Sequence, residues 1–156
     1  MADAAVQIQA LPLVLREVLR MRIALRPLDI PINTCTNLDG ATVARLGPDE
    51  WLVLEKKLEL PAQTETFVSR VDISHRHVAF EVKGQQARDV LNTACPLDLH
   101  HEAFPPGSAT RTILGKAEIV LLHQGGALAY RVECGRSFAP YVSDLLREAA
   151  KDYSLE

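Results

Sequence analysis

The 156-residue sequence is poor in the features that mark secreted and membrane proteins. It has three cysteines, Cys35, Cys95 and Cys134, and no CxxC pair, so we expect reduced thiols in a cytoplasmic compartment and no disulfide framework. No apolar run approaches the ~20 residues that a membrane-spanning helix needs. The first residues lack a basic segment followed by an apolar one, so no signal peptide is expected.

The sequence also lacks a strong charge of either sign and a visible cofactor motif. Its formal net charge is −3, which gives no general attraction for nucleic acid or anionic lipid. Its eight glycines form neither GxGxxG nor GxxxxGK[ST], so no dinucleotide-binding or phosphate-binding loop is predicted. Aromatic residues make up only 5% and hydrophobic residues 47%, which predicts an aliphatic core in a single domain, 1–156, with 1–15 as a flexible lead.

Alternating apolar and polar residues predict several strands. Residues 18–26 alternate strictly and should form a strand with one buried face and one basic face. Turn residues at 37–40 and 47–50 predict a hairpin whose second strand, 51–55, is buried on both faces. Further strands are predicted at 78–82, 110–114, 117–123 and 128–134.

Three segments have the periodicity of helices. A short helix is predicted from Pro61, with Phe67, Val68 and Val71 as its apolar stripe. Residues 85–94 and a terminal segment capped by Ser137 complete the set. The mixture predicts an α+β fold of two small lobes, with a mostly antiparallel sheet covered by helices on one face.

The best local candidate for a binding surface is a basic group near the N-terminus. Arg16, Arg20, Arg22 and Arg26 lie close together in sequence and are opposed there only by Glu17. A solvated face is one interpretation, and an interface with an acidic protein partner is another, because arginine is enriched where surfaces meet. Nucleic acid is a third and less favoured partner, because lysine is scarce nearby and no aromatic residues accompany the arginines.

Two clusters of polar residues contain the residue types of catalytic or metal-binding sites. Asp72, Ser74, His75 and His77 include the residue types of a Ser–His–Asp triad, but such a triad needs groups from separate elements, so a turn is the simpler interpretation.

Cys95, His100 and His101 include zinc-ligand types, but adjacent histidines in an extended segment point apart and no fourth ligand has metal spacing. We predict no catalytic, cofactor-binding or metal-binding residue in this chain.

Seven segments between Ala44 and Tyr153 form an ordered set: 46–52 (LGPDEWL), 71–74 (VDIS), 82–91 (VKGQQARDVL), 94–99 (ACPLDL), 104–107 (FPPG), 114–116 (LGK) and 136–141 (RSFAPY). In this order and with this spacing they resemble the gamma subunit family of heterotetrameric sarcosine oxidase.

The resemblance implies a fold similar to part of the glycine cleavage T-protein. It also implies a non-catalytic gamma subunit, bound chiefly to an alpha subunit within an alpha-beta-gamma-delta complex and capable of self-association when isolated. That complex oxidises sarcosine to glycine, produces hydrogen peroxide and transfers the one-carbon unit to tetrahydrofolate. FAD, FMN, NAD and tetrahydrofolate are then expected on the large partner subunits, and zinc on delta. The alternative is a free-standing folate-binding or aminomethyltransferase-like module.

Overall fold

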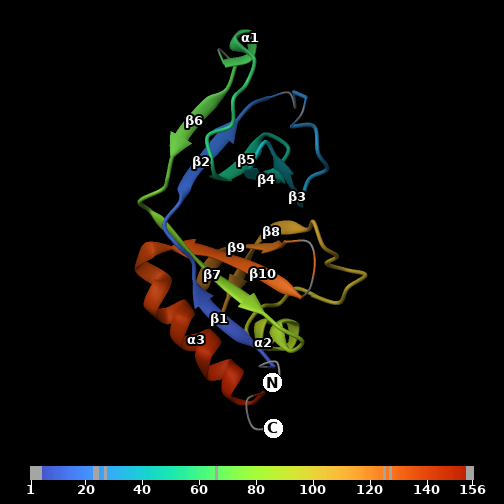
Figure 1. Ribbon diagram of the computed structural model, residues 1–156, viewed down its shortest axis with the longest axis vertical. Coiled ribbons are helices and arrows are strands. Elements are labelled where there is room, and N and C mark those ends of the chain that lie inside the picture. Colours follow the sequence, from blue (N-terminus) through green and yellow to red (C-terminus); the bar gives the residue numbers. More distant parts are fainter. Residues whose placement is uncertain are drawn as a thin grey trace.

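Two five-stranded antiparallel sheets are stacked on each other in the computed structural model, which describes residues 5–22, 25–26, 28–65, 67–124, 126 and 128–153. Figure 1 shows one sheet in the lower half of the molecule and the other in the upper half. We call the lower one sheet I and the upper one sheet II. The expected α+β class with antiparallel strands and two lobes is confirmed.

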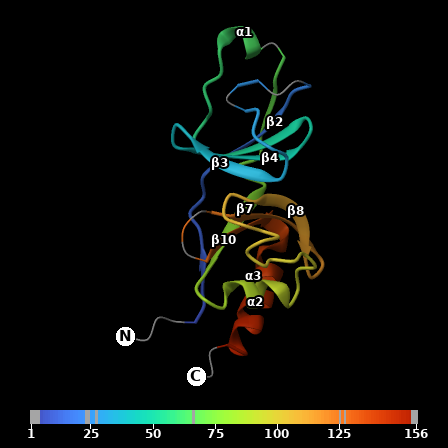
Figure 2. The same ribbon diagram turned by 90° about the vertical axis from the view of Figure 1, so that its right-hand side faces the viewer.

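Sheet I carries the helices. In spatial order its strands are β1 (Gln7–Ala10), β7 (His77–Lys83), β10 (Ala129–Gly135), β9 (Ala117–His123) and β8 (Ala109–Leu114). Helices α2 (Ala87–Asn92) and α3 (Ala139–Lys151) cover the face that is turned away from sheet II, as Figure 2 shows. The predicted apolar face of α2 is confirmed, because Ala87, Val90 and Leu91 are buried against this sheet.

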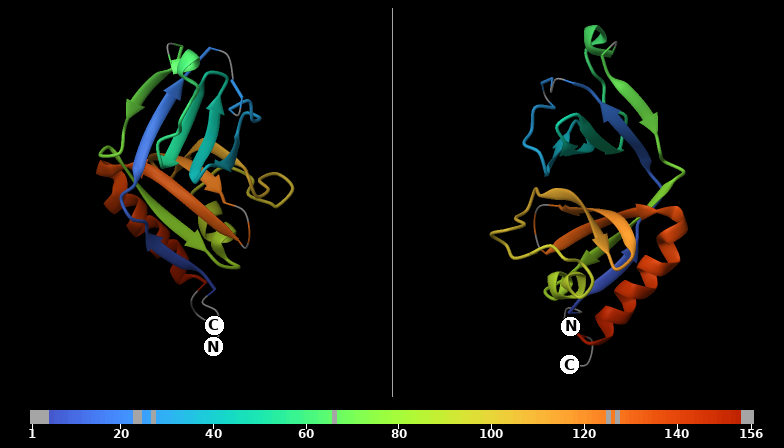
Figure 3. Two further views of the ribbon diagram at one scale, coloured as in Figure 1. Left: turned by 45° about the horizontal axis from the view of Figure 1, so that its top comes forward. Right: turned by 180° about the vertical axis from the view of Figure 1, so that it is seen from behind.

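Sheet II has fewer elements around it. Its strands are, in order, β3 (Thr34–Leu38), β4 (Ala41–Gly47), β5 (Glu50–Glu55), β2 (Leu15–Arg20) and β6 (Ser69–Asp72). Figure 3 looks onto this sheet in its left panel, with β6 and β2 at one edge. The short helix α1 (Ala62–Glu65) precedes β6. None of the described helices is long and apolar enough to span a bilayer.

The two sheets are closest where β3 and β4 cross β8. Backbone hydrogen bonds join them there: Ala109 N–H donates to the Asn33 carbonyl at 3.0 Å, and Cys35 N–H donates to the Gly107 carbonyl at 2.8 Å. β6 lies at the opposite edge of sheet II from β3. Backbone hydrogen bonds thus join the sheets on the β3–β8 side, whereas on the β6 side the chain itself crosses from sheet II to sheet I after Asp72.

Several predicted elements are confirmed in detail. The β3–β4 turn has positive φ at Asp39 and Gly40 (51° and 88°), which is the backbone that a tight hairpin requires. β5 is buried on both faces up to Leu54. Trp51 is fully buried, and its indole N–H donates to the Leu28 carbonyl at 2.9 Å.

Three predicted elements are wrong or displaced: the strand over 18–26, the helix from Pro61 and the lead 1–15. The strand expected over 18–26 begins earlier and ends at Arg20 as β2, and Ile23 and Ala24 lie outside the described residues. The helix expected to carry Phe67 and Val71 stops at Glu65, and the chain then extends as β6 because it can pair with β2.

The expected lead 1–15 contains β1, which pairs with β7. Residues 1–4 of that lead lie outside the described part of the chain. Ser137 lies in a 3₁₀ turn and does not cap α3.

Candidate functional site

Arg16 does not belong to an exposed basic face. Its side chain is fully buried, and its Nε donates to Glu133 Oε2 at 2.6 Å. Because β2 begins at Leu15, Arg16 lies within the strand and faces sheet I, where Glu133 projects from β10. The prediction that placed Arg16 on a surface with the other arginines is therefore wrong.

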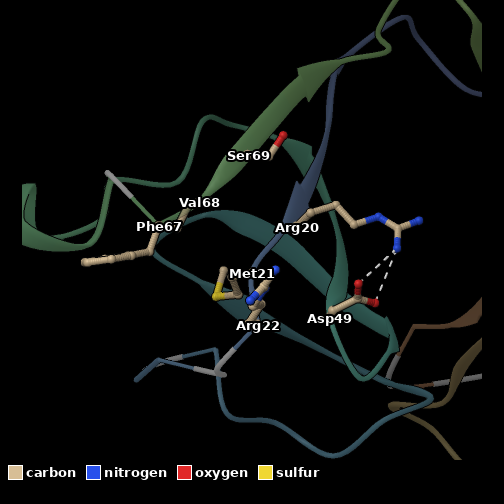
Figure 4. A pocket seen from close by; sticks show the side chains of 7 residues that line it. All are labelled: Arg20, Met21, Arg22, Asp49, Phe67, Val68 and Ser69. Carbon is tan, nitrogen blue, oxygen red and sulfur yellow. Dashed lines mark hydrogen bonds and ion pairs between the residues drawn. The ribbon is translucent and has the colours of Figure 1, made fainter.

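Arg20, Arg22 and Arg26 are exposed, but they do not share one strand face, because β2 ends at Arg20. Arg20 binds Asp49 at 3.3 Å, and Arg26 lies 3.7 Å from Asp29. Arg20 and Arg22 line an open hollow of about 360 Å³, shown in Figure 4. The opposite wall of that hollow includes Phe67, which points away from Arg20. The three residues remain a predicted interface.

A buried charge network joins the two sheets. We use the name inter-sheet charge network for Arg16 and Glu55 of sheet II with Arg131 and Glu133 of sheet I. Glu133 also accepts a hydrogen bond from Arg131 Nε at 2.8 Å, and Arg131 Nη1 binds Glu55 Oε1 at 2.8 Å. Two guanidinium groups and two carboxylates thus neutralise each other across the interface, where an unpaired charge would be costly.

The sequence contains only a weak signal for this network. Arg131 and Glu133 alternate with Tyr130 and Val132 in β10, which a local analysis treats as one apolar and one solvated face. In the structure both faces of β10 are buried. A second sheet covers the face that carries the charges.

Glu50 and Arg111 form a further bridge between the sheets. The hydrogen bonds from Arg111 hold the pKa of Glu50 below its ordinary value, against the opposing effect of burial. Arg20 also binds Glu50, at 3.0 Å. Each buried carboxylate in the described ranges, namely Glu17, Glu50 and Glu133, is therefore bound by arginine and is poorly placed to act as a catalytic base.

We expect the Glu50 bridge to make stability depend on acid pH. Because the folded pKa of Glu50 lies below its unfolded value, its stabilising contribution is complete above about pH 4.3 and is lost as the pH falls through the lowered value. The urea midpoint of the wild-type chain should fall more steeply below that pH than the midpoint of Glu50→Gln. Superimposable pH profiles for the two proteins would contradict the assignment.

A cleft of about 390 Å³ opens between the sheets on the β6 side. Its apolar lining consists of Val18, Leu46, Leu52, Val71, Ile73, Ile119 and Val120. Its polar lining includes Arg20, Arg76, His77, Arg111, Glu118 and Glu133. Nδ1 of His77 is buried and has no hydrogen-bond partner in the described part of the chain. Burial, together with the neighbouring arginines Arg16, Arg76 and Arg111, lowers the pKa of His77 against the effect of Glu133.

The Asp72–His77 segment is a turn, as predicted. Ser74 N–H donates to Asp72 Oδ1 at 2.8 Å, and Ser74 Oγ accepts from Arg16 N–H at 2.9 Å. A hydrogen bond from the Ser74 hydroxyl, together with the bond from the Ser74 N–H, holds the pKa of Asp72 below its ordinary value. These side chains satisfy the backbone where the chain passes from sheet II to sheet I.

Cys95, His100 and His101 are not brought together in the described structure. No set of three metal-ligand side chains converges within the described ranges. Cys95 is buried, whereas His100 and His101 are exposed in a turn. Their rings are 4.1 Å apart, so the expectation that they point in opposite directions is wrong; it assumed an extended backbone.

The cysteines are free thiols in the structure. Burial raises the pKa of Cys35 and of Cys134 to about 11. Both thiols are therefore protonated at neutral pH and are weak nucleophiles.

The fold has clear relatives among solved structures. One from Corynebacterium sp. U-96, described as heterotetrameric sarcosine oxidase in complex with pyrrole 2-carboxylate, superposes with a TM-score of 0.80 and 22% identity over 99% of this chain and 89% of that chain. The aminomethyltransferase T of the glycine cleavage system from Bartonella henselae gives a TM-score of 0.66 and 12% identity over 97% of this chain and 50% of that one. The expected likeness to part of the T-protein fold is confirmed.

Sequence comparison identifies the family. Sarcosine oxidase subunit gamma of Corynebacterium sp. (strain U-96) is 29% identical over 126 residues, which are 76% of this chain and 60% of the relative. Its counterpart from Corynebacterium sp. (strain P-1) is 31% identical over 126 residues, which are 77% of this chain and 62% of the relative. The chain thus spans about three fifths of the length of these curated relatives. The profile described as "SoxG: Sarcosine oxidase, gamma subunit family" matches residues 20–152, and the chain belongs to this family.

Proposed function

We propose that this chain is the non-catalytic gamma subunit of a heterotetrameric sarcosine oxidase in the cytoplasm, and that it binds chiefly to the alpha subunit. Family membership over residues 20–152 is the observation that carries the proposal. The buried carboxylates support it, because Glu50 and Glu133 bind arginines that join the two sheets and are therefore poorly placed to act as catalytic bases. Such pairs fix the geometry of a rigid module that binds another protein.

The proposal assigns the chemistry to the partner subunits. They would hold FAD, FMN, NAD and tetrahydrofolate, oxidise sarcosine to glycine with production of hydrogen peroxide, and transfer the one-carbon unit. This chain would contribute a surface to which the other subunits bind. The exposed apolar side chains Phe67, Val71 and Phe138 support that role, since 76%, 49% and 44% of each remains accessible in the isolated chain.

Co-expression with the neighbouring subunit genes tests the proposal. We expect the tagged chain to recover a complex that shows flavin absorbance and forms hydrogen peroxide from sarcosine. The chain expressed alone should be colourless and inactive with sarcosine. An isolated chain that carries flavin or turns over sarcosine would refute the non-catalytic assignment.

One alternative has an observation in its favour, which is the similarity in fold to aminomethyltransferase T. A free-standing folate-binding module would bind tetrahydrofolate without partners. Equilibrium titration of the isolated chain separates the two functions: we expect no saturable binding, and saturable binding would favour the alternative. This chain corresponds to half of that transferase, so a complete transferase site would need elements from elsewhere.

A further inference from the structure

We propose that the inter-sheet cleft at the β6 edge is the surface that receives the partner subunit, through a partner segment that places a large apolar side chain in the cleft and a carboxylate beside Arg76. This inference rests on the proposed function and adds to it a location and a chemistry. The cleft shares Arg20 with the hollow beside Arg22 that Figure 4 shows, but its other lining residues are different.

The shape of the cleft favours an inserted apolar group. The sheets are joined by backbone hydrogen bonds on the β3–β8 side, and β6 is the strand farthest from that junction within sheet II. At the base of the cleft Leu52 and Ile73 are buried, whereas Val71 on β6 remains 49% exposed. An apolar side chain seated between Val71 and Val120 would cover surface that sheet I leaves uncovered.

The charges around the cleft favour a carboxylate next to that apolar group. Arg76 is exposed, and no carboxylate among the residues that the structure describes pairs with it. Arg136 is adjacent, because its N–H donates to the Arg76 carbonyl at 2.8 Å, and it has no carboxylate partner within those ranges either. The Arg76 guanidinium is therefore available for an acidic partner, and the Arg136 guanidinium, whose Nη1 donates to the His75 carbonyl at 3.4 Å, is a second basic group on the neighbouring segment.

The buried carboxylates of the lining are already paired. Glu50 is bound by Arg20 and Arg111, and Glu133 by Arg16 and Arg131. Asp72 keeps its charge, because its hydrogen bonds come from the neutral Ser74, but it does not line the cleft. Glu118 beside Arg111 is the exposed acidic group of the lining.

The surface outside the cleft favours a protein over a small molecule. Ile113 lies on the same face of β8 as Arg111 and is 45% exposed, and Phe138 lies two residues beyond Arg136 and is 44% exposed. Apolar surface thus continues past the cavity on both β8 and the turn before α3. A free ligand that filled only the cleft would leave this surface uncovered, whereas a subunit would cover it.

Charge-reversing variants with matched controls test the location. Val71→Glu places a charge where the partner's apolar side chain would lie, and Arg76→Glu repels the partner's carboxylate. Arg147→Glu and Leu13→Glu introduce the same charge changes at exposed positions outside the cleft. All four are co-expressed in full-length chains with the partner subunits, and affinity for the complex is measured by competition with the wild-type chain.

We expect Val71→Glu and Arg76→Glu to weaken binding by about tenfold or more, as removal of a central contact does, and the two controls to change it less than about twofold. Circular dichroism and thermal melting verify folding, and Arg76→Gln replaces Arg76→Glu if the latter melts early. Equal effects of all four variants, no effect of any, or loss only in Arg147→Glu and Leu13→Glu would overturn the location.

Two other results are distinguishable. A wild-type chain that recovers no partner would refute the proposed function itself, and the location with it. An isolated chain that sediments as a dimer and becomes a monomer in Val71→Glu would assign the cleft to a second copy of this chain, and the partner-segment proposal would then be wrong.

Discussion

Glu133→Gln is expected to lower the free energy of unfolding by about 3–5 kcal/mol, because it leaves two buried guanidinium groups without their shared charge. Glu133 is 2% exposed and lies 2.6 Å from Arg16 Nε and 2.8 Å from Arg131 Nε. Glutamine keeps the shape but offers one oxygen and no charge. Urea denaturation followed by circular dichroism, with the denaturant slope held common to both proteins, measures the loss.

Glu148→Gln is the matched control. Glu148 also lies 2.6 Å from a basic side chain, Lys151, but its side chain is 72% exposed, so we expect little or no measurable change. If the two substitutions had similar small effects, the inter-sheet charge network would not contribute to holding the sheets together. A large loss in Glu133→Gln alone would show that burial makes the difference, since the ion-pair distances are the same.

Trp51→Ala is expected to cost about 3–5 kcal/mol, the usual range for truncation of a buried tryptophan. Trp51 is fully buried in the apolar cluster on the outer face of sheet II, and its ring also lies under the Arg45 guanidinium at 5.0 Å. The substitution would leave a cavity and an unpaired Leu28 carbonyl. Circular dichroism must be the probe, because this is the only tryptophan of the chain.

Trp51→Phe separates the two contributions. It keeps much of the buried ring but removes the N–H that binds Leu28 O, so we expect a loss clearly smaller than that of alanine. A phenylalanine variant as unstable as the alanine variant would mean that the hydrogen bond, and not the packed volume, dominates at this position.

Local sequence patterns predict the elements of this fold well where a turn and its flanking strands agree. The β4–β5 hairpin and the turn at Asn37–Gly40 are in this class, as is the amphipathic α3, whose Val142 and Leu146 are buried. In each case neighbours in sequence are also neighbours in space. The resemblance of the ordered segments between 44 and 153 predicted the family, which the profile match confirms.

Local patterns do not predict the structure where pairing between distant segments of the chain determines it. Phe67 and Val71 fit a helix stripe, yet the free edge of β2 pairs with this segment and makes it a strand. Nothing in the alternation of a strand says which of two sheets it joins, so the division between sheets I and II could not be predicted. Arg16 looked like a surface charge because its partner, Glu133, lies 117 positions away.

The order of the strands has a consequence for synthesis. β1 pairs with β7, and all of sheet II lies between them in the chain. On the ribosome, β1 therefore emerges long before the strand that it needs, while β2 to β6 arrive as a continuous block whose partners are all nearby. We expect nascent chains that end after β6 to contain a protease-resistant sheet II and an N-terminal segment still open to cleavage, which becomes protected once β7 and β10 have left the exit tunnel.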